Sequence, residues 1–320
     1  MKTRLLQVVA GVVFSLGAVG VVFAAYPEKP ITMNVAYSPG GGNDTIARLM
    51  AKHIEKYLGV KVVVENNPGA GGQIGFTKLA KAKPDGYTIG LLSAPSVFMI
   101  ELLRPSVGYT LNDFQPIANV QSDPIVLAVE AKSDLNTLED AVAFIRNNPG
   151  KVNVGGDGPQ SNVQLQAVAF EKVLKTKVNF ISYPGSGPAT TGLLGKEVDM
   201  ALLTASSVQQ YVQAKRVKVL GVFSDKTLPS LSGVKTVTAV LGKEVPSVGT
   251  AMRGVAAPHG LSSDKVDFLD KAFRQLLNDS EFQQAASKMG IVLDYQDHAA
   301  FTESLNKARE NTKQYIDVMK

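Results

Sequence analysis

The sequence of 320 residues contains no cysteine and no tryptophan, and only three histidines. Without cysteine, the chain cannot form disulfides, use a thiol nucleophile, build a cysteine metal site or carry a lipid on an N-terminal cysteine. The histidines, His53, His259 and His298, are dispersed and lack the short spacing of zinc ligands. His53 lies on the apolar stripe of an expected helix, where a core-edge role is favoured over a catalytic one. We expect no metal and no cofactor.

The motifs of common nucleotide-binding and hydrolytic enzymes are also missing. No Gly-Lys-Ser/Thr sequence of a phosphate-binding loop occurs, and no Gly-x-Ser-x-Gly elbow. Thr45 and Ile74 stand where a dinucleotide fingerprint beginning at Gly40 or Gly69 requires glycine. These absences predict that the protein is not an enzyme.

The excess of positive charge is small. The net charge is +5, spread along the chain without a block of Lys and Arg. A nucleic-acid partner is therefore not expected.

Long apolar runs are confined to the N-terminus. Lys2 and Arg4 precede an apolar run over 5–23, which ends in Ala24 and Ala25. This layout predicts a cleavable secretory signal over residues 1–25, with a retained membrane anchor as the alternative. Beyond it, no apolar run approaches the ~18 residues of a membrane span. We expect a soluble mature protein in the periplasm.

The remaining sequence alternates short β-branched runs with helical patterns. Strands are expected at 31–37, 60–66, 87–93, 124–130, 152–156, 178–183, 198–204 and 217–224. Helices are expected at 45–58, at 162–175 after a cap at Ser161 or Asn162, from Pro188 onward, and as two helices around 289–295. This alternation predicts an α/β fold with largely parallel sheets.

Four glycine-rich turns follow strands and open helices, at 37–45, 66–76, 155–162 and 183–192. Any one of them could be a simple tight turn. In open parallel sheets, however, such turns gather at the carboxyl ends of the strands, where ligands bind. Two turns from each half of the chain would then face one cleft.

The four turns contain no lysine or arginine, and Asp44 and Asp157 are their only charged residues. We therefore expect an anion to be held by helix N-termini and backbone N–H groups, assisted by polar side chains, without a guanidinium clamp.

Several long segments resemble the Bug family of extracytoplasmic solute receptors, the periplasmic components of tripartite tricarboxylate transporters. The most specific is "LGVKVVVENNPGAGGQIGFTKLAKAKPDGYTIG", and others are "YPEKPITMNVAYSPGGGNDTIAR", "NNPGKVNVGGDGP" and "ISYPGSGPATTGLLGKEVDMAL". The resemblance covers essentially the whole mature chain.

The resemblance implies a two-lobed α/β periplasmic-binding-protein fold of type II, a Venus flytrap whose lobes are mainly parallel sheets flanked by helices. We expect lobe 1 to comprise 26–124 and 248–320, and lobe 2 to comprise 125–247. Hinge crossings are expected near 122–126 and 246–254.

In the family, two turns of lobe 1 form a pincer on a carboxylate, and turns of lobe 2 contact the rest of the ligand. The expected lobe 1 contacts are Tyr37, Pro39, Gly40, Gly41, Asn43, Asp44, Gly69, Ala70, Gly71, Gly72, Gln73 and Ser93. The expected lobe 2 contacts are Asp157, Gly158, Ser161, Asn162, Tyr183, Gly185, Asp199 and Thr204, with Asp199 near the cleft.

The third turn departs from the family pattern. Gly156 and Asp157 stand where serines are common, and Asn162 replaces a frequent histidine. This puts the usual dicarboxylate in doubt and leaves open a monocarboxylate, an aromatic acid or a ligand with an amino group.

The resemblance implies a monomeric, non-enzymatic receptor that closes on a small organic acid and presents it to integral membrane permease subunits. The alternative is a ligand-loaded sensor that docks on a membrane receptor kinase.

Overall fold

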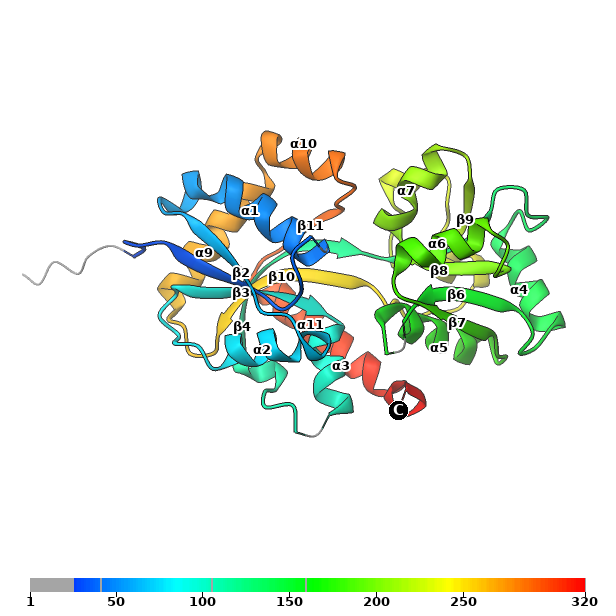
Figure 1. The fold of residues 1–320 in the computed structure, drawn as a ribbon, viewed down its shortest axis with the longest axis horizontal. Coiled ribbons are helices and arrows are strands. Elements are labelled where there is room, and N and C mark those ends of the chain that lie inside the picture. The colour runs from blue at the N-terminus through cyan, green and yellow to red at the C-terminus, as the bar shows by residue number, and fades with distance from the viewer. Residues whose placement is uncertain (1–25, 41, 105, 159, 320) are drawn as a thin grey trace, which may run out of the picture.

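The computed structural model describes residues 26–319 except Gly41, Pro105 and Pro159. The predicted signal at 1–25 and the predicted ligand contact Gly41 lie outside the described residues. The chain folds into two α/β lobes joined side by side (Figure 1). None of the helices within the described part of the chain is long and apolar enough to span a membrane.

Lobe 1 is built on a six-stranded sheet of order β11-β4-β10-β3-β1-β2. Its strands are β1 (Ile31–Val35), β2 (Val62–Asn66), β3 (Thr88–Ala94), β4 (Phe114–Asp123), β10 (Ala251–Pro258) and β11 (Leu293–Gln296). Its helices are α1 (Gly42–Leu58), α2 (Gln73–Ala80), α3 (Ser96–Leu103), α9 (Ser263–Leu277), α10 (Ser280–Lys288) and α11 (His298–Lys313).

Lobe 2 is built on a five-stranded sheet of order β7-β6-β8-β5-β9. Its strands are β5 (Ile125–Glu130), β6 (Asn153–Asp157), β7 (Asn179–Tyr183), β8 (Met200–Thr204) and β9 (Val217–Phe223). Its helices are α4 (Leu138–Asn147), α5 (Asn162–Leu174), α6 (Ser186–Leu194), α7 (Ala205–Gln213) and α8 (Val237–Leu241).

Each sheet is mixed, so the prediction of mainly parallel sheets was wrong for about half of the pairings. Strands β1, β2 and β3 are parallel, as are β6, β7 and β8. The strands that enter or leave the other lobe, β5 and β10, pair antiparallel with both of their neighbours. A strand that crosses between lobes enters its sheet without a crossover helix, whereas consecutive parallel strands need a long crossover connection, which is usually a helix.

Apolar side chains cover both faces of each sheet. In lobe 1, α1, α9 and α10 pack on one face, and α2, α3 and α11 pack on the other. The 17-residue α1 packs on the sheet through one apolar face, on which Ile46, Met50 and Ile54 recur every four residues and are fully buried. The helix ends at Gly59, whose φ of 74° suits a glycine stop.

Two stretches of chain cross between the lobes. The first is short, since β4 ends at Asp123 and β5 begins at Ile125. The second, 246–250, is fastened to α5 of lobe 2. Gln166 donates to the Pro246 carbonyl (2.9 Å) and accepts from the Gly249 N–H (3.0 Å). If the lobes close on a ligand, we expect the chain to bend after Gly249, just before β10 begins at Ala251.

The C-terminal end of the chain also touches both lobes. After α11 a short 3₁₀ turn, Ile316–Met319, lies against α5 of lobe 2, where the red end of the ribbon is seen in Figure 1. Tyr315 and Met319 belong to the same buried apolar cluster as Leu165 and Ala169 of α5. Lys172 of α5 lies over the Tyr315 ring, 4.9 Å from its centroid. This contact adds a non-covalent link beside the two crossings.

Candidate ligand-binding cleft

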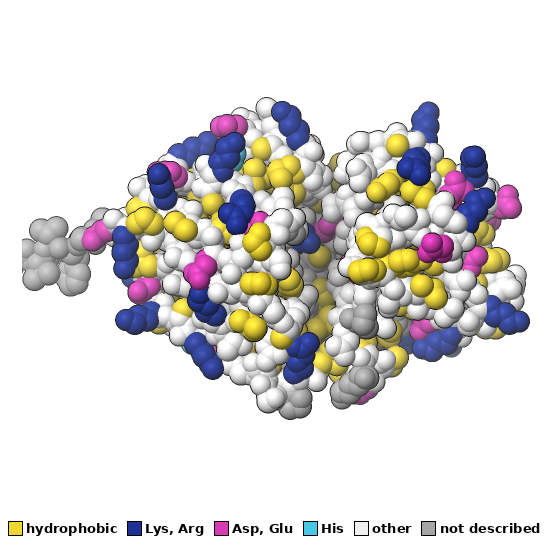
Figure 2. All heavy atoms as spheres, in the orientation of Figure 1, with side chains coloured by type: hydrophobic (Ala, Val, Ile, Leu, Met, Phe, Trp, Pro, Cys, Tyr) yellow, Lys and Arg dark blue, Asp and Glu magenta, His cyan; other side chains and the backbone are white. Residues whose placement is uncertain are grey.

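The carboxyl ends of the parallel strands in both lobes point at the junction between the lobes. In lobe 1, Ser93 near the end of β3 pairs with Arg253 at the start of β10. In lobe 2, Thr204 at the end of β8 pairs with Ile125 at the start of β5. The turns that follow these parallel strands therefore lie along the junction, where Figure 2 shows a deep furrow. The structure brings the four glycine-rich turns to one cleft.

The first turn is fixed by Asp44, in the first turn of α1. Its buried carboxylate accepts from the Gly40 N–H (2.8 Å), from Nε of Arg48 (2.9 Å) and from Nδ2 of Asn66 (2.9 Å). Burial opposes its ionisation, but these donors together hold the pKa of Asp44 below its ordinary value. Asp44 therefore shapes the turn, and its oxygens are already engaged with protein donors.

The second turn has an uncommon backbone. Gly69, Ala70, Gly71 and Gly72 all have positive φ, at 135°, 50°, 72° and 110°. Within this turn the Gly72 N–H donates to the Gly69 carbonyl (3.0 Å), and the Gln73 N–H donates to the Ala70 carbonyl. Glycine tolerates these angles, and its bare backbone lets a ligand approach the turn closely. Arg104 fastens the turn, since its Nη1 donates to the Ala70 carbonyl and to Oε1 of Gln73, both at 2.8 Å.

In lobe 2, Asp157 ends β6 at the mouth of the third turn. Its Oδ1 accepts from the Ser186 hydroxyl at the start of α6 (2.9 Å). Burial raises the pKa of Asp157, and this single hydrogen bond opposes the shift only in part. Ser161 caps α5 by accepting from the Gln164 N–H (3.1 Å), as the sequence predicts. Gly158 lies between them, and Gly185 precedes α6.

Three predicted contacts of lobe 2 have other partners. Asn162 donates to the Gly249 carbonyl (2.8 Å), and the Tyr183 hydroxyl donates to Glu197 (2.9 Å). Asp199 precedes β8 and accepts from the Asn153 N–H (2.8 Å) at the start of β6. The expectation that Asp199 lies near the cleft was wrong, because it occupies the amino end of a strand whose carboxyl end faces the cleft.

The sequence did not single out Arg253, whose side chain lies at the cleft end of lobe 1. Its Cα partners are Ser93 on β3 and Gln121 on β4. A Cβ built on Gly42, the first residue of α1, would lie 3.5 Å from Nη2 of Arg253. Burial lowers the pKa of Arg253, while the nearby Asp123 and Tyr37 raise it in part. The signal in the sequence was one cation inside an otherwise uncharged strand, "AMRGVAAP".

Tyr37 and Asp123 complete this part of the cleft. Burial raises the pKa of the Tyr37 hydroxyl, whereas hydrogen bonds with Ser96 and Ser93 lower it. The buried Asp123 is the last residue of β4, where the first crossing begins, and its carboxylate accepts from the backbone N–H of Ser206 in α7 (3.0 Å) and from that residue's hydroxyl. Asp123 thus joins lobe 1 to lobe 2 at the floor of the cleft.

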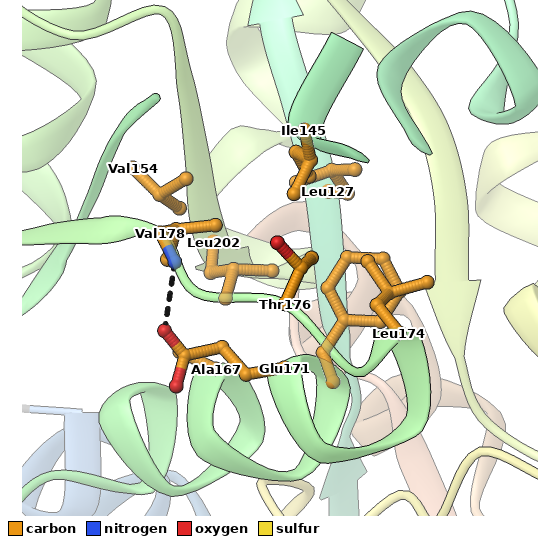
Figure 3. Close-up of a pocket in the computed structure, with 10 residues that line it drawn as sticks. Leu127, Ile145, Val154, Ala167, Glu171, Leu174, Thr176, Val178 and Leu202 are labelled. Carbon is orange, nitrogen blue, oxygen red and sulfur yellow. Dashed lines mark hydrogen bonds between the residues drawn. The ribbon is translucent and has the colours of Figure 1, made fainter. Parts of the chain in front are cut away.

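Two hollows lie apart from the predicted contacts. A small apolar cavity inside lobe 2 lies among Leu127, Phe170 and Leu202, with Glu171 at its edge accepting from the Val178 N–H at 2.9 Å (Figure 3). Its volume of about 10 Å³ is at the limit for one water molecule, so it is a packing gap. A groove of about 530 Å³ lies at the hinge beside Met252, on the face of β10 opposite to Arg253.

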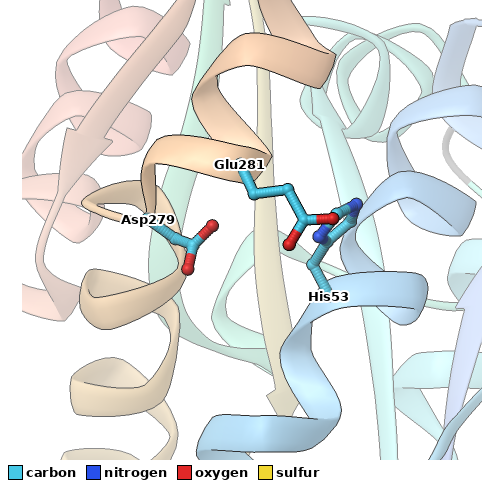
Figure 4. Close-up of side chains that lie close together, drawn as sticks. All are labelled: His53, Asp279 and Glu281. Atoms are coloured by element: carbon cyan, nitrogen blue, oxygen red, sulfur yellow. The ribbon is translucent and has the colours of Figure 1, made fainter.

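His53, Asp279 and Glu281 form the acidic and histidine cluster that most resembles a metal site among the described residues (Figure 4). Asp279 is already engaged: it caps α10 through the Phe282 N–H (2.9 Å) and accepts from Lys56 and from the Tyr57 hydroxyl. These donors, Lys56 first, hold the pKa of Asp279 far below its ordinary value. We therefore interpret the cluster as the fastening of α10 to α1, in agreement with a core-edge role for His53.

Comparison with known proteins identifies the family. Residues 46–317 match the family described as "Tripartite tricarboxylate transporter family receptor", abbreviated TctC. The chain belongs to this family. Because TctC proteins are solute receptors, the prediction that the chain is not an enzyme is confirmed. The resemblance to Bug proteins is confirmed as well, since the TctC receptor is 31% identical to protein BugT of Bordetella pertussis over 90% of this chain and 89% of that protein.

Solved structures of this fold extend the comparison. A TctC solute-binding protein from Polaromonas has a TM-score of 0.83 and 28% identity, covering 92% of this chain and 99% of that chain. MatC from Rhodopseudomonas palustris with bound malate has a TM-score of 0.72 and 22% identity, covering 91% of this chain and 100% of that chain. The likeness to MatC concerns the fold.

Proposed function

We propose that this TctC-family receptor captures a small organic carboxylate in the periplasm and delivers it to a tripartite membrane transporter. The observation that carries the proposal is the convergence of glycine-rich helix starts from both lobes on one cleft. Helix N-termini present N–H groups to an anion, and an anion that touches both lobes favours the closed form.

The proposal has support beyond the cleft. The N-terminal sequence has the layout of a cleavable export signal, which fits a periplasmic address. Hydrogen bonds to an ionised acceptor contribute about 1.5–3 kcal/mol each, so four to six of them can hold a small acid at micromolar strength after ordering costs. Malate is the ligand in MatC, and it belongs in the first set of compounds to test.

The test is a thermal-shift and calorimetry screen of the purified mature protein with malate, succinate, adipate, benzoate and glutamate. Adipamide, the neutral analogue of adipate, serves as the control. We expect at least one acid to stabilise the protein by about 2.7 kcal/mol at a hundred times its dissociation constant, with adipamide inactive. Binding of none of the five acids would contradict the proposal.

Delivery to a transporter has a separate test in cells. Deletion of the gene should abolish uptake of the labelled acid identified by the screen. If uptake persists but transcription induced by that acid is lost, the sensor function holds instead.

A further inference from the structure

We propose that Arg253 pairs with the ligand carboxylate beside the N-terminus of α1, so that the cleft uses a half-buried cation as well as backbone N–H groups. This inference rests on the proposed function and specifies how the acid is recognised. The argument starts from where Arg253 lies. Val255 and Ala257, the next residues on the same face of β10, are fully buried in the apolar layer under α1 and α9. Arg253 continues this row to the edge of the sheet that faces the cleft.

The side chain of Arg253 is half-buried and has no carboxylate partner. Its Nε is fully buried and makes no hydrogen bond. Among the ion pairs between described residues, none includes Arg253. Asp123 contributes favourably at longer range, yet its carboxylate is engaged by Ser206. Burying a charge without a partner is costly, and such groups are usually paired.

A second positive field lies against the same guanidinium. Nη2 of Arg253 lies close to Gly42, where α1 begins, and the N-terminus of a 17-residue helix carries about half a positive charge. The acidic residue in this turn, Asp44, is occupied by Arg48, Gly40 and Asn66. A half-buried cation and a helix N-terminus repel each other until an anion lies between them.

Two neighbouring side chains also have a buried polar atom without a hydrogen-bond partner. Gln121, the Cα partner of Arg253 on β4, has a buried side-chain oxygen without a hydrogen bond, and so has Asn43 in the first turn of α1. Tyr37 lies close enough to Arg253 for the guanidinium to lower the pKa of its hydroxyl. Unpaired polar atoms in one place indicate a polar guest. An ionised carboxylate satisfies the guanidinium and the helix N–H groups, whereas the two amide oxygens are acceptors and need a donor, such as a hydroxyl or ammonium group of the ligand.

The test compares Arg253→Gln and Arg253→Lys with the wild type, using the tightest-binding acid among malate, succinate, adipate, benzoate and glutamate. The matched control is Arg274→Gln, which removes an exposed arginine of the same lobe that pairs with Asp270. Calorimetry gives the dissociation constant, and thermal denaturation gives the stability of the ligand-free protein.

We expect Arg253→Gln to weaken binding at least about tenfold, Arg253→Lys to weaken it less, and Arg274→Gln to leave it unchanged. The ligand-free Arg253→Gln protein should be as stable as the wild type or more stable, because an unpaired half-buried charge is gone. A purely structural arginine would instead lower the melting temperature of the ligand-free protein when replaced.

Wild-type affinity in a folded Arg253→Gln variant would overturn the inference while leaving the proposed function intact. Failure of the wild type to bind any of the five acids would instead remove the proposed function. A crystal structure of the loaded wild-type protein decides the matter without any variant. It supports the inference if a guanidinium nitrogen donates to the carboxylate, and it overturns the inference if no nitrogen of Arg253 comes within 4 Å of the ligand.

Discussion

One residue in each lobe gives its side of the cleft a charge, and the two charges have opposite sign. Arg253 in lobe 1 is a cation with no ion-pair partner among the described residues, whereas Asp157 in lobe 2 is a partly buried carboxylate held by the Ser186 hydroxyl. A carboxylate at this position repels a second negative group on a ligand. We therefore expect Asp157 to distinguish monocarboxylate, dicarboxylate and amino-acid ligands.

Asp157→Asn should raise the affinity for malate or adipate about two- to tenfold at neutral pH, because it removes a negative charge from the cleft. Asp199→Asn is the matched control, since Asp199 lies at the opposite end of the sheet of lobe 2. Calorimetry measures both. Weaker binding by Asp157→Asn would show instead that this carboxylate accepts from the ligand, as it would from an ammonium group.

The same variant should change the dependence of stability on pH. The folded pKa of Asp157 lies above its ordinary value, so the native state binds this proton more tightly than the unfolded state does. Ionisation of Asp157 therefore lowers the free energy of unfolding as the pH rises from the ordinary pKa through the folded pKa. The melting temperature of Asp157→Asn relative to wild type should increase between about pH 4 and pH 7.

At the scale of elements, the turn 69–72 joins β2 to α2 with four successive positive φ angles. Gly71→Ala places a methyl group on the backbone that we expect to contact the ligand. We expect about tenfold or greater loss of affinity, together with about 1–2 kcal/mol less stability from the left-handed strain. Gly59→Ala is a closely matched control: its φ is 74° against 72°, and nothing lies within 4 Å of its added Cβ.

Both variants should lose similar stability in chemical denaturation, and only Gly71→Ala should lose affinity. Equal affinity in the two variants would exclude close approach of the ligand at Gly71.

The elements that the sequence predicted are those with strong local signals. The eight predicted strands are present, and α1 follows from its apolar periodicity. Strands β4, β10 and β11 were missed. In β4, Pro116 and the buried polar residues Asn119 and Gln121 interrupt the apolar pattern. The pairing of β4 with β10 spans more than 120 residues of sequence, so local periodicity does not reveal it.

The parts of the cleft that were predictable are likewise those with a local signal in the sequence. Glycine turns after parallel strands carry a local signal, and their convergence follows from the rule for open sheets. Arg253 lies on a strand that returns from the other lobe, so its approach to α1 depends on long-range pairing. Asp199 was misplaced because its position was taken from the family resemblance, although the same rule puts the amino end of β8 away from the cleft.

At the scale of the whole molecule, the C-terminal turn is a third link between the lobes. A chain ending at Lys313 loses the buried side chains of Tyr315, Ile316 and Met319. We expect its free energy of unfolding to be about 2–4 kcal/mol lower than that of the full chain. Without ligand, it should also show a larger radius of gyration in X-ray scattering. Val318→Ser is the control, because Val318 is 63% exposed. An unchanged radius would exclude a tethering role for the turn.

The position of this terminus matters to anyone who wishes to turn the receptor into a reporter. Met319, at the end of the described chain, is buried, and its carbonyl accepts from Gln160 of lobe 2 (3.4 Å). We expect a fluorescent protein or affinity tag fused there to hinder the closing movement of the two lobes. A fusion at Met319 should therefore reduce ligand-induced closure, whereas the same protein inserted at the exposed Gly150 should leave closure unchanged.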